Sequence, residues 1–377
     1  MSVPPTLAIR GSASGDVVVE DERIVSTPSS VSATRTLDAT DCRVVPGFVD
    51  LQCNGGFGVD FTSAPEHAHH VAARLPETGV TSFLPTVISA PEDVTRRAVA
   101  ELDVLRCSSP GARSLGVHLE GPFLNPVRRG AHSLQHLRLP DREEAAGWSP
   151  AAGVALVTLA PELDGALDLV ADLVGRGVTV CCGHCEVSVG GLKAAVAAGV
   201  SGATHLFNAM GSLSARSPGT AGVVLAHPTL IAGIIVDGLH VDPAMVAVAW
   251  RALGPGRVFL VTDAIAALGL PEGPFRIGDI DVLVDETGVH TVDGVLAGSV
   301  LRMDAAVRNL LTFTGCSIDD AVAAASTTPA RLLGRHDIGV IEPGAYGDVV
   351  LLDDANHVVA TVVGGLVVFD PQERASR

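Results

Sequence analysis

The sequence lacks any long uninterrupted hydrophobic run. Hydrophobic residues make up 47% of the 377 residues, but they come in short runs broken by Gly, Asp, His or Glu, whereas a membrane-spanning helix needs about 18 or more consecutive apolar residues. The first residues, MSVPPTLAIRGSASGD, also lack the basic start and apolar stretch of a secretory signal. We therefore expect a cytoplasmic protein that does not bind membranes.

Paired cysteines and low-complexity segments are also missing. The chain has seven cysteines, an odd number without a paired framework, which favours reduced thiols. The single Cys-x-x-Cys, at Cys182 and Cys185, has no second pair, so we expect no structural zinc site there. The composition excludes a disordered chain, a collagen and a disulfide-stapled mini-domain.

Positive charge is scarce. Lys and Arg total 25 against 42 Asp and Glu, which gives a formal net charge of −17. Such a surface repels nucleic acid and acidic lipid, so we expect neither as a partner. A small anionic substrate requires local cations that outweigh this field.

The middle of the chain alternates strand-like and helix-like segments. The strand-like segments are 44–51, 80–87, 114–120, 154–160, 178–184, 202–207, 231–237 and 258–264. Helical patterns include 92–106, 162–176, 242–253, 302–313 and 318–334. Repeated βα units with buried strands favour a parallel sheet, and eight such strands favour a closed (β/α)₈ barrel.

Both ends of the chain read as short strands and turns. We expect residues 1–45 and 338–377 to form one small β domain, a β-sandwich, beside an α/β barrel domain of residues 46–337. The segment 272–297 is rich in Gly and in alternating apolar residues. We interpret it as a β insertion after the eighth strand.

Four polar residues stand out in the strand-like segments of this predicted barrel. Glu120, His184, His205 and Asp263 lie at or near the ends of the third, fifth, sixth and eighth segments. Carboxyl ends of barrel strands converge on one face, where active sites lie. One carboxylate and two imidazoles form a catalytic zinc ligand set, and Asp263 can then act as general base and acid. A lone histidine at a strand end is more often a satisfied polar residue, but four such residues are hard to assign to packing.

Sequence motifs from residue 46 to residue 353 carry a family resemblance. They are PGFVDLQCNGGFGVDF (46–61), HLEGPFLNPVRRGAH (118–132), GHCEVS (183–188), ATHLFNAM (203–210), RSPG (216–219), VDGLHV (236–241), VTDA (261–264), LAGS (296–299) and GVIEPGAYGDVVLLD (339–353). Their order and content resemble the N-acetylglucosamine-6-phosphate deacetylases of the amidohydrolase superfamily. The resemblance implies a deformed (β/α)₈ barrel with a small β domain from both termini.

The resemblance also implies roles for individual residues. Glu120, His184 and His205 would bind one divalent metal ion, by default Zn²⁺ with Fe²⁺ or another ion as alternatives, and Asp263 would be the general acid and base. His132 would lie beside the acetamide carbonyl and stabilise an oxyanion. The implied substrate contacts are Ala131, Asn208, Ala209, Arg216, Asp237, His240, Leu296, Ala297 and Gly298. Arg216 and His240 suit the phosphate, and a homodimer is expected because phosphate ligands in this family can cross a subunit interface.

Two positions depart from the broader superfamily. Most relatives carry His-x-His at the end of the first strand, where this chain has Gln52 and Asn54. Neutral amides are poor zinc ligands, which predicts one metal rather than two. Gln52 and Asn54 either hydrogen-bond within the loop or contact substrate. GHCEVS differs from the more usual GHSNAT, which alters the pocket wall beside His184 but not the ligand.

Function therefore has one preferred interpretation and two alternatives. The preferred one is removal of acetate from N-acetylglucosamine 6-phosphate. The same scaffold could instead act on N-acetylgalactosamine 6-phosphate or another N-acyl amine, or serve as a non-catalytic scaffold protein. We interpret the cluster EHAHH (66–70), Arg128 and Arg129 as surface features, and Trp148 and Trp250 as packing residues.

Overall fold

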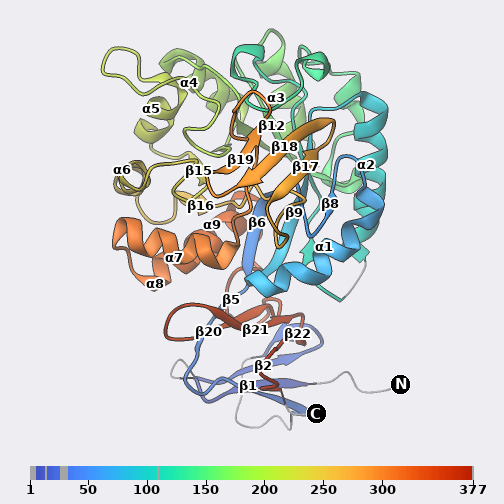
Figure 1. The fold of residues 1–377 in the computed structure, drawn as a ribbon, viewed down its shortest axis with the longest axis vertical. Coiled ribbons are helices and arrows are strands. Elements are labelled where there is room, and N and C mark those ends of the chain that lie inside the picture. The colour runs from blue at the N-terminus through green and yellow to red at the C-terminus, as the bar shows by residue number, and fades with distance from the viewer. Residues whose placement is uncertain (1–5, 13–14, 26–32, 108–109, 376–377) are drawn as a thin grey trace.

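A computed structural model describes residues 6–12, 15–25, 33–107 and 110–375; the parts of the predicted segments that fall at 1–5, 13–14, 26–32, 108–109 and 376–377 lie outside this description. Figure 1 shows a large body of strands and helices above a smaller body of sheets. The blue and red ends of the chain lie together in the smaller body.

Eight parallel strands form the nearly closed barrel that the sequence predicts. They are β6 (Phe48–Cys53), β9 (Val80–Ile88), β11 (Val117–Glu120), β12 (Val154–Leu159), β13 (Thr179–Cys182), β14 (Gly202–Ala203), β15 (Ile231–Ile234) and β16 (Val258–Leu260). Each pairs in parallel with the next, in that order. The short strands β7 (Gly55–Gly56), β8 (Val59–Asp60) and β10 (Arg113–Ser114) lie beside them.

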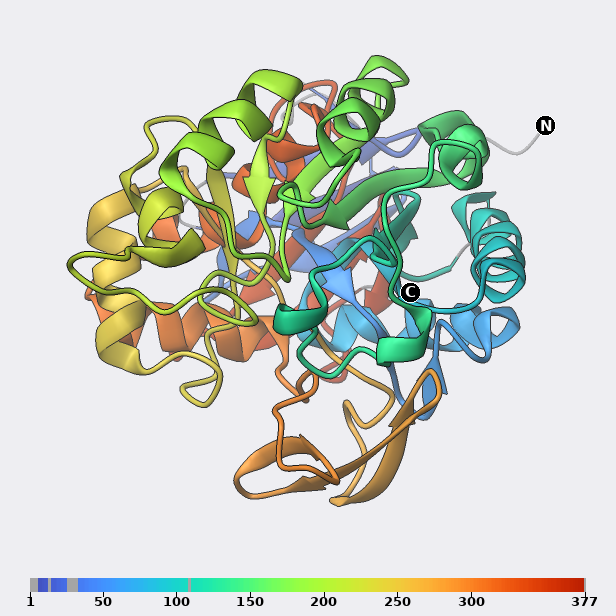
Figure 2. The ribbon, with the colours of Figure 1, turned by 90° about the horizontal axis from the view of Figure 1, so that it is seen from above.

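Helices cover the outside of the barrel (Figure 2). They are α1 (Ala68–Arg74), α2 (Glu92–Val104), α3 (Ala166–Gly175), α4 (Val189–Ala198), α5 (Gly219–Ala226), α6 (Pro243–Leu253), α7 (Met303–Thr314), α8 (Ile318–Ala325) and α9 (Thr327–Leu332). Single 3₁₀ turns occupy Pro65–His67, Leu75–Thr78, Leu105–Cys107, Pro126–Arg128, Leu134–His136, Glu144–Gly147 and Pro150–Ala152.

Two predicted helices differ from the observed ones. The pattern over 318–334 is two helices, because Ser326 leaves helical geometry (φ −134°, ψ −78°). The pattern over 162–176 becomes helical only at Ala166, after Gly165 in the left-handed region (φ +81°). In both cases the helical spacing of apolar residues continues across a residue with non-helical backbone angles. The spacing of apolar residues does not reveal such a local break in the helix.

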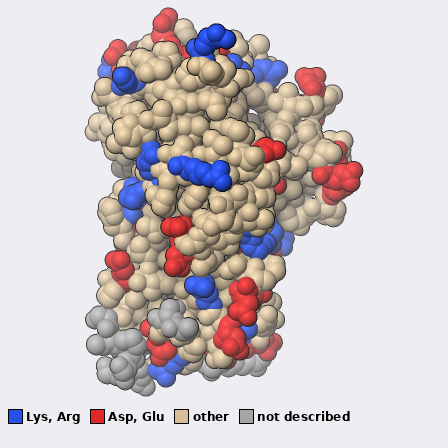
Figure 3. Space-filling model, turned by 90° about the vertical axis from the view of Figure 1, so that its left-hand side faces the viewer, with Lys and Arg blue, Asp and Glu red and all other residues tan. Residues whose placement is uncertain are grey.

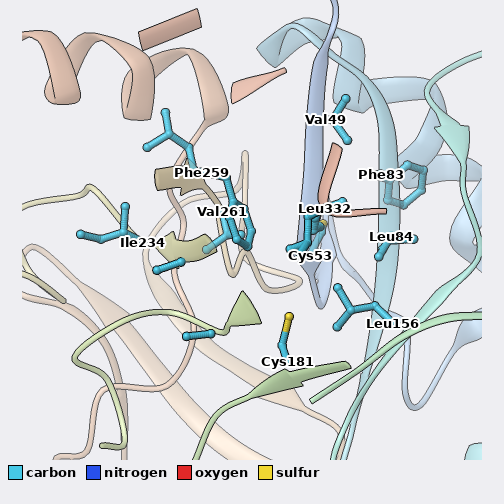
Figure 4. Packing of buried hydrophobic residues seen from close by; sticks show 14 of the residues in the cluster. Val49, Cys53, Phe83, Leu84, Leu156, Cys181, Ile234, Phe259, Val261 and Leu332 are labelled. Atoms are coloured by element: carbon cyan, nitrogen blue, oxygen red, sulfur yellow. The ribbon is translucent and has the colours of Figure 1, made fainter. Parts of the chain in front are cut away.

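The barrel interior is apolar at one end and polar at the other. Leu84, Thr86 and Ile88 alternate along β9 and therefore share one face of that strand. Figure 4 shows apolar side chains such as Leu84, Leu156 and Cys181 meeting between the strands. The apolar packing holds the strands in place, and polar groups gather toward the carboxyl ends.

The smaller body consists of two four-stranded sheets. One has the order β3 (Arg23–Ile24), β2 (Val17–Glu20), β1 (Leu7–Arg10) and β4 (Arg35–Asp38). The other has the order β22 (Leu366–Phe369), β21 (Val358–Val363), β20 (Val349–Leu352) and β5 (Arg43–Pro46). An apolar cluster that includes Ile9, Leu37, Leu351 and Val362 joins them. The division of the chain into two domains stays a prediction, which this separate core supports.

The first predicted strand, 44–51, is in fact two strands. Residues Arg43–Pro46 pair with β20 in the terminal sheet, whereas Phe48–Cys53 pair with β9 in the barrel. A Cβ on Gly47, which lies between them, would come within 2.1 Å of the Thr81 Oγ1 atom. Only glycine therefore fits where the chain passes from one body to the other.

The predicted insertion is a separate three-stranded antiparallel sheet. It contains β17 (Gly273–Ile277), β18 (Ile280–Asp285) and β19 (Gly288–Thr291) and projects from the barrel in Figure 2. Its turn contacts the loop after β11, where Gln135 Nε2 donates to Asp279 Oδ2 at 3.0 Å and His136 Nε2 lies 2.9 Å from that oxygen. This sheet thus covers one side of the barrel mouth.

Candidate active site

A cavity of about 200 Å³ lies at the carboxyl ends of the barrel strands. Its lining combines titratable groups from the strand ends with an apolar wall from the insertion. The lining residues are Asn54, Ile88, Glu120, Gly130, Ala131, His132, His184, His205, Asn208, Ala209, His240, Asp263, Ile277, Ile280, Val295, Leu296, Ala297 and Gly298.

Three of these residues bring ligand atoms together. Glu120 Oε1 lies 3.1 Å from His184 Nε2 and 2.9 Å from His205 Nε2, and the two nitrogen atoms are 3.1 Å apart. Within the described residues, this is the group of three whose ligand atoms lie within 4.8 Å of one another. A carboxylate with two imidazoles at this spacing can hold a divalent metal ion.

The charge states of these groups suit a cation. Burial by itself would raise the pKa of Glu120. Hydrogen bonds from His184 and His205 outweigh burial and hold this pKa well below its usual range. His184 Nδ1 donates to the carbonyl oxygen of Arg128 at 2.9 Å. This bond keeps a proton on Nδ1, so that once Nε2 gives up the proton it shares with Glu120, its lone pair can bind a metal ion.

The backbone at three of the site residues is strained. His184, His205 and Asp263 have φ values of +48°, +27° and +50°, which residues other than glycine rarely adopt. Such conformations persist only where the surrounding structure holds them, and they concentrate at functional sites.

Two amide side chains hold Asp263. Gln52 Nε2 donates to Asp263 Oδ1 at 3.1 Å and also to Glu120 Oε1 at 3.1 Å, and Asn54 Nδ2 donates to the same Asp263 oxygen at 2.7 Å. Burial first, and the Glu120 carboxylate second, raise the pKa of Asp263 to about 6. The amides thus occupy one carboxylate oxygen and leave Oδ2 for chemistry.

His132 faces the cavity as a neutral hydrogen-bond donor. The backbone N–H of Ser89 donates to His132 Nδ1 at 3.4 Å, and the Ser89 hydroxyl lies 2.9 Å from that nitrogen. Burial first, and the neighbouring His184 second, lower the pKa of His132 to about 3. With Nδ1 accepting, the proton of the neutral ring lies on Nε2.

Two predicted substrate residues do not line the cavity. The Asp237 carboxylate instead contacts His240, whose Nδ1 lies 2.6 Å from Asp237 Oδ2. Burial alone would raise the pKa of Asp237, but this hydrogen bond outweighs burial and lowers it. Arg216 is exposed on the loop between β14 and α5 and is absent from the cavity lining.

The sequence placed Leu296 and Ala297 at the cavity, which they line, but missed the rest of its apolar wall. Ile277 and Ile280 come from the insertion, and Ile88 ends β9. They read as ordinary core residues, because only the folding of the insertion over the mouth brings them to the cavity. Ser89 was missed too, although it directly follows β9 and lies two residues after the second predicted strand, 80–87.

The remaining sequence signals do not line the cavity. In EHAHH, the residues His67, His69 and His70 are exposed and lie near or in α1. Cys182 and Cys185 are free and buried. Trp148 stacks on Phe123 with ring centroids 5.6 Å apart, as a packing residue does.

Comparisons with known proteins decide the family. The model of the amidohydrolase family matches residues 43–368. The chain belongs to the amidohydrolase family. Among curated proteins, it is 40% identical over 351 residues to the Bos taurus N-acetylglucosamine-6-phosphate deacetylase, which covers 89% of this chain and 86% of the relative. It is 36% identical over 366 residues to the N-acetylgalactosamine-6-phosphate deacetylase of Shewanella sp. (strain ANA-3), covering 95% and 92%.

A solved structure of this amidohydrolase group carries a ligand. A variant of the Mycobacterium smegmatis N-acetyl-D-glucosamine-6-phosphate deacetylase, in complex with N-acetyl-D-glucosamine-6-phosphate, superposes with a TM-score of 0.86 at 32% identity. The match covers 97% of this chain and 99% of that one. Among the described residues of this amidohydrolase, no helix has the length and hydropathy of a membrane span.

Proposed function

We propose that this amidohydrolase is a metal-dependent deacetylase that converts N-acetyl-D-glucosamine 6-phosphate to D-glucosamine 6-phosphate and acetate. The observation that carries the proposal is a buried acid with two histidines facing a second buried acid across one cavity. The similarity to curated deacetylases supports the substrate.

The ligand set fits one divalent metal. Glu120, His184 and His205 would hold it, by default as Zn²⁺ with Fe²⁺ as the alternative. When bound, the metal supplies Lewis-acid polarisation and lowers the pKa of a coordinated water. Gln52 and Asn54 point amide nitrogens at Asp263, and an N–H group is no metal ligand, so we propose a single metal.

Asp263 moves the proton in the proposed reaction. Its Oδ2 takes a proton from the attacking water and later delivers it to the departing amine. A pKa near 6 suits both roles, because the carboxyl is mostly ionised at neutral pH and still binds a proton readily. The amide donors on Oδ1 keep the carboxylate from rotating.

His132 stabilises the charge on the former carbonyl oxygen. It lines the cavity, Ser89 holds its Nδ1, and its Nε2 lies 3.8 Å from Glu120 Oε2. Because the ring stays neutral, it donates a hydrogen bond without transferring its proton.

Phosphate binding needs at least one cation from outside the cavity lining. No Lys or Arg is among the lining residues in the described part of the chain, and His240 lines the cavity without belonging to the group of Glu120, His184 and His205. We propose that Arg216 and His240 bind the phosphate, that Asp237 orients His240, and that the enzyme is a homodimer. Buried free cysteines support a reducing, cytoplasmic setting.

A second substrate has a specific observation in its favour. A relative at 36% identity is an N-acetylgalactosamine-6-phosphate deacetylase. The two sugars differ in the direction of one hydroxyl, so the same cavity lining can serve either.

The test is acetate release from both sugar phosphates and from unphosphorylated N-acetylglucosamine, with and without a chelator. We expect the highest kcat/KM on N-acetylglucosamine 6-phosphate and loss of activity with chelator. A preference for the galactosamine phosphate would reassign the substrate. A metal-loaded protein that releases no acetate from any of them would favour a non-catalytic scaffold.

A further inference from the structure

The barrel has one seam where the strands do not form a continuous ladder. Between β16 and β6 the pairing reduces to an isolated bridge from Cys53 to Ala264. The backbone N–H of Asp263 donates to the Gln52 carbonyl at 2.9 Å, and that of Asn54 donates to the Ala264 carbonyl at 2.7 Å. The two amide side chains that hold Asp263, and Asp263 itself, thus lie at this junction.

A buried carboxylate spans this seam. Asp50 on β6 is fully buried, and its Oδ1 accepts the backbone N–H groups of Gln52 at 3.2 Å and Thr262 at 3.3 Å. The Thr262 hydroxyl donates to Asp50 Oδ2 at 2.5 Å. One side chain therefore satisfies donors from both strands.

Thr262 also restrains the backbone around Asp263, the next residue. Its Oγ1 also accepts the backbone N–H of Ala264 at 3.2 Å, so its hydroxyl bridges the two sides of Asp263. The Ser299 N–H donates to the Asp263 carbonyl at 2.8 Å. These bonds enclose the peptide whose φ of +50° would otherwise relax.

We propose that Asp50 and Thr262 form a clamp that positions Asp263 for proton transfer, although neither touches the cavity. Burial raises the pKa of Asp50 to about 7, while the hydrogen bonds from Thr262 and Gln52 oppose the rise. The clamp acts through backbone geometry: it fixes the register of 50–54 against 262–264 and hence the direction of the Asp263 carboxylate. This inference rests on the proposed role of Asp263 in deacetylation.

The experiment compares Thr262→Val, Thr262→Ser and Asp50→Asn with the wild type. Valine keeps the shape of threonine but removes the hydroxyl, and serine restores it. A displacement of about 1 Å at a reacting group can cost about 100-fold in rate. We expect Thr262→Val to lower kcat by about 10- to 100-fold with KM and metal content unchanged, and Thr262→Ser to recover most of the loss.

The matched control is Thr361→Val. Thr361 is fully buried in β21, and its hydroxyl donates to the Pro76 carbonyl at 2.8 Å, so this change also removes one buried hydroxyl but lies far from the site. We expect it to lower the melting temperature and leave kcat unchanged. If Thr262→Val keeps the wild-type kcat and loses only stability, as this control does, the clamp has no positioning role. Should Thr262→Val not fold, Asp50→Asn decides by the same criterion.

A second measurement does not depend on the substrate. Hydrogen exchange of the peptide around Asp263 reports whether its backbone opens. We expect faster exchange there in Thr262→Val and unchanged exchange there in Thr361→Val. Unchanged exchange in both would overturn the clamp even in a fully active enzyme, whereas a wild type that releases no acetate would count against the proposed function alone.

Discussion

Asp263 carries a carboxyl whose surroundings determine how it titrates. Burial and Glu120 raise its pKa to about 6. A general base works only when ionised, so we expect kcat/KM to fall as the pH drops through about 6 and below. A cation held by Glu120 opposes the rise in pKa and moves this fall toward lower pH. A pH–rate profile measures it, and activity that increases on acidification would contradict a carboxylate base.

Replacing Asp263 by Asn removes the proton acceptor and keeps the shape. We expect kcat to fall by about 10²- to 10⁴-fold, the usual contribution of a general base, while the metal stays bound. Elemental analysis and acetate release measure the two effects. The control is Asp348→Asn, a buried aspartate of the small body whose pKa burial also raises; it should keep its kcat. Retained activity in Asp263→Asn would reassign the base.

Arg216 tests the phosphate site. Its guanidinium can bind two phosphate oxygens, and it is exposed on its loop. We expect Arg216→Met to raise KM for the phosphorylated sugar much more than it lowers kcat, and to leave the unphosphorylated sugar unaffected. Steady-state kinetics on both sugars decide this, and an unchanged KM would remove Arg216 from the site.

Elements, rather than single residues, bring the site together. Glu120 ends β11, and His184, His205 and Asp263 follow β13, β14 and β16 within a few residues. The sequence predicted this convergence because buried strand runs have a readable end. It did not predict that β14 would pair over only Gly202–Ala203. The strand-like segment GATHLF continues beyond Ala203, but the structure turns there and forms no further sheet pairing.

Helix ends affect stability without touching the chemistry. The Ser317 hydroxyl oxygen accepts the Asp320 N–H at 3.1 Å and caps α8. We expect Ser317→Ala to lower the free energy of unfolding by about 1 kcal/mol and leave kcat unchanged. Denaturant unfolding measures the first and acetate release the second; Ser317→Asp, which can still cap, is the control. A drop in kcat would show that α8 also influences the site.

At the scale of the whole molecule, a metal held by Glu120, His184 and His205 would link the ends of separate barrel strands. A ligand that binds only the folded state stabilises it by about 2.7 kcal/mol when its free concentration is about 100 times Kd. We expect a chelator to lower the melting temperature and one equivalent of metal per chain to restore it. In His184→Asn, one of the three metal-binding side chains is missing, so the melting temperature should not respond to chelator or to added metal. Two equivalents per chain would contradict the single-metal prediction.

Charge is also a property of the whole molecule. On the face shown in Figure 3, acidic and basic side chains are interspersed and separated by large uncharged areas. With a formal net charge of −17, the enzyme offers a phosphorylated substrate attraction only from local cations. The phosphate subsite therefore depends on where a few arginines and histidines lie.

The sequence by itself determined the barrel, the terminal strands, the insertion and the residues that meet at the strand ends. Each of these can be predicted from the local spacing of apolar residues or from short sequence motifs. Only the tertiary structure decided what Gln52 and Asn54 contact, which apolar residues wall the cavity, and that Asp237 faces His240 rather than the cavity. These features join segments far apart in the chain, such as 52 with 263 and 88 with 277, and no local pattern records which distant group a side chain will meet.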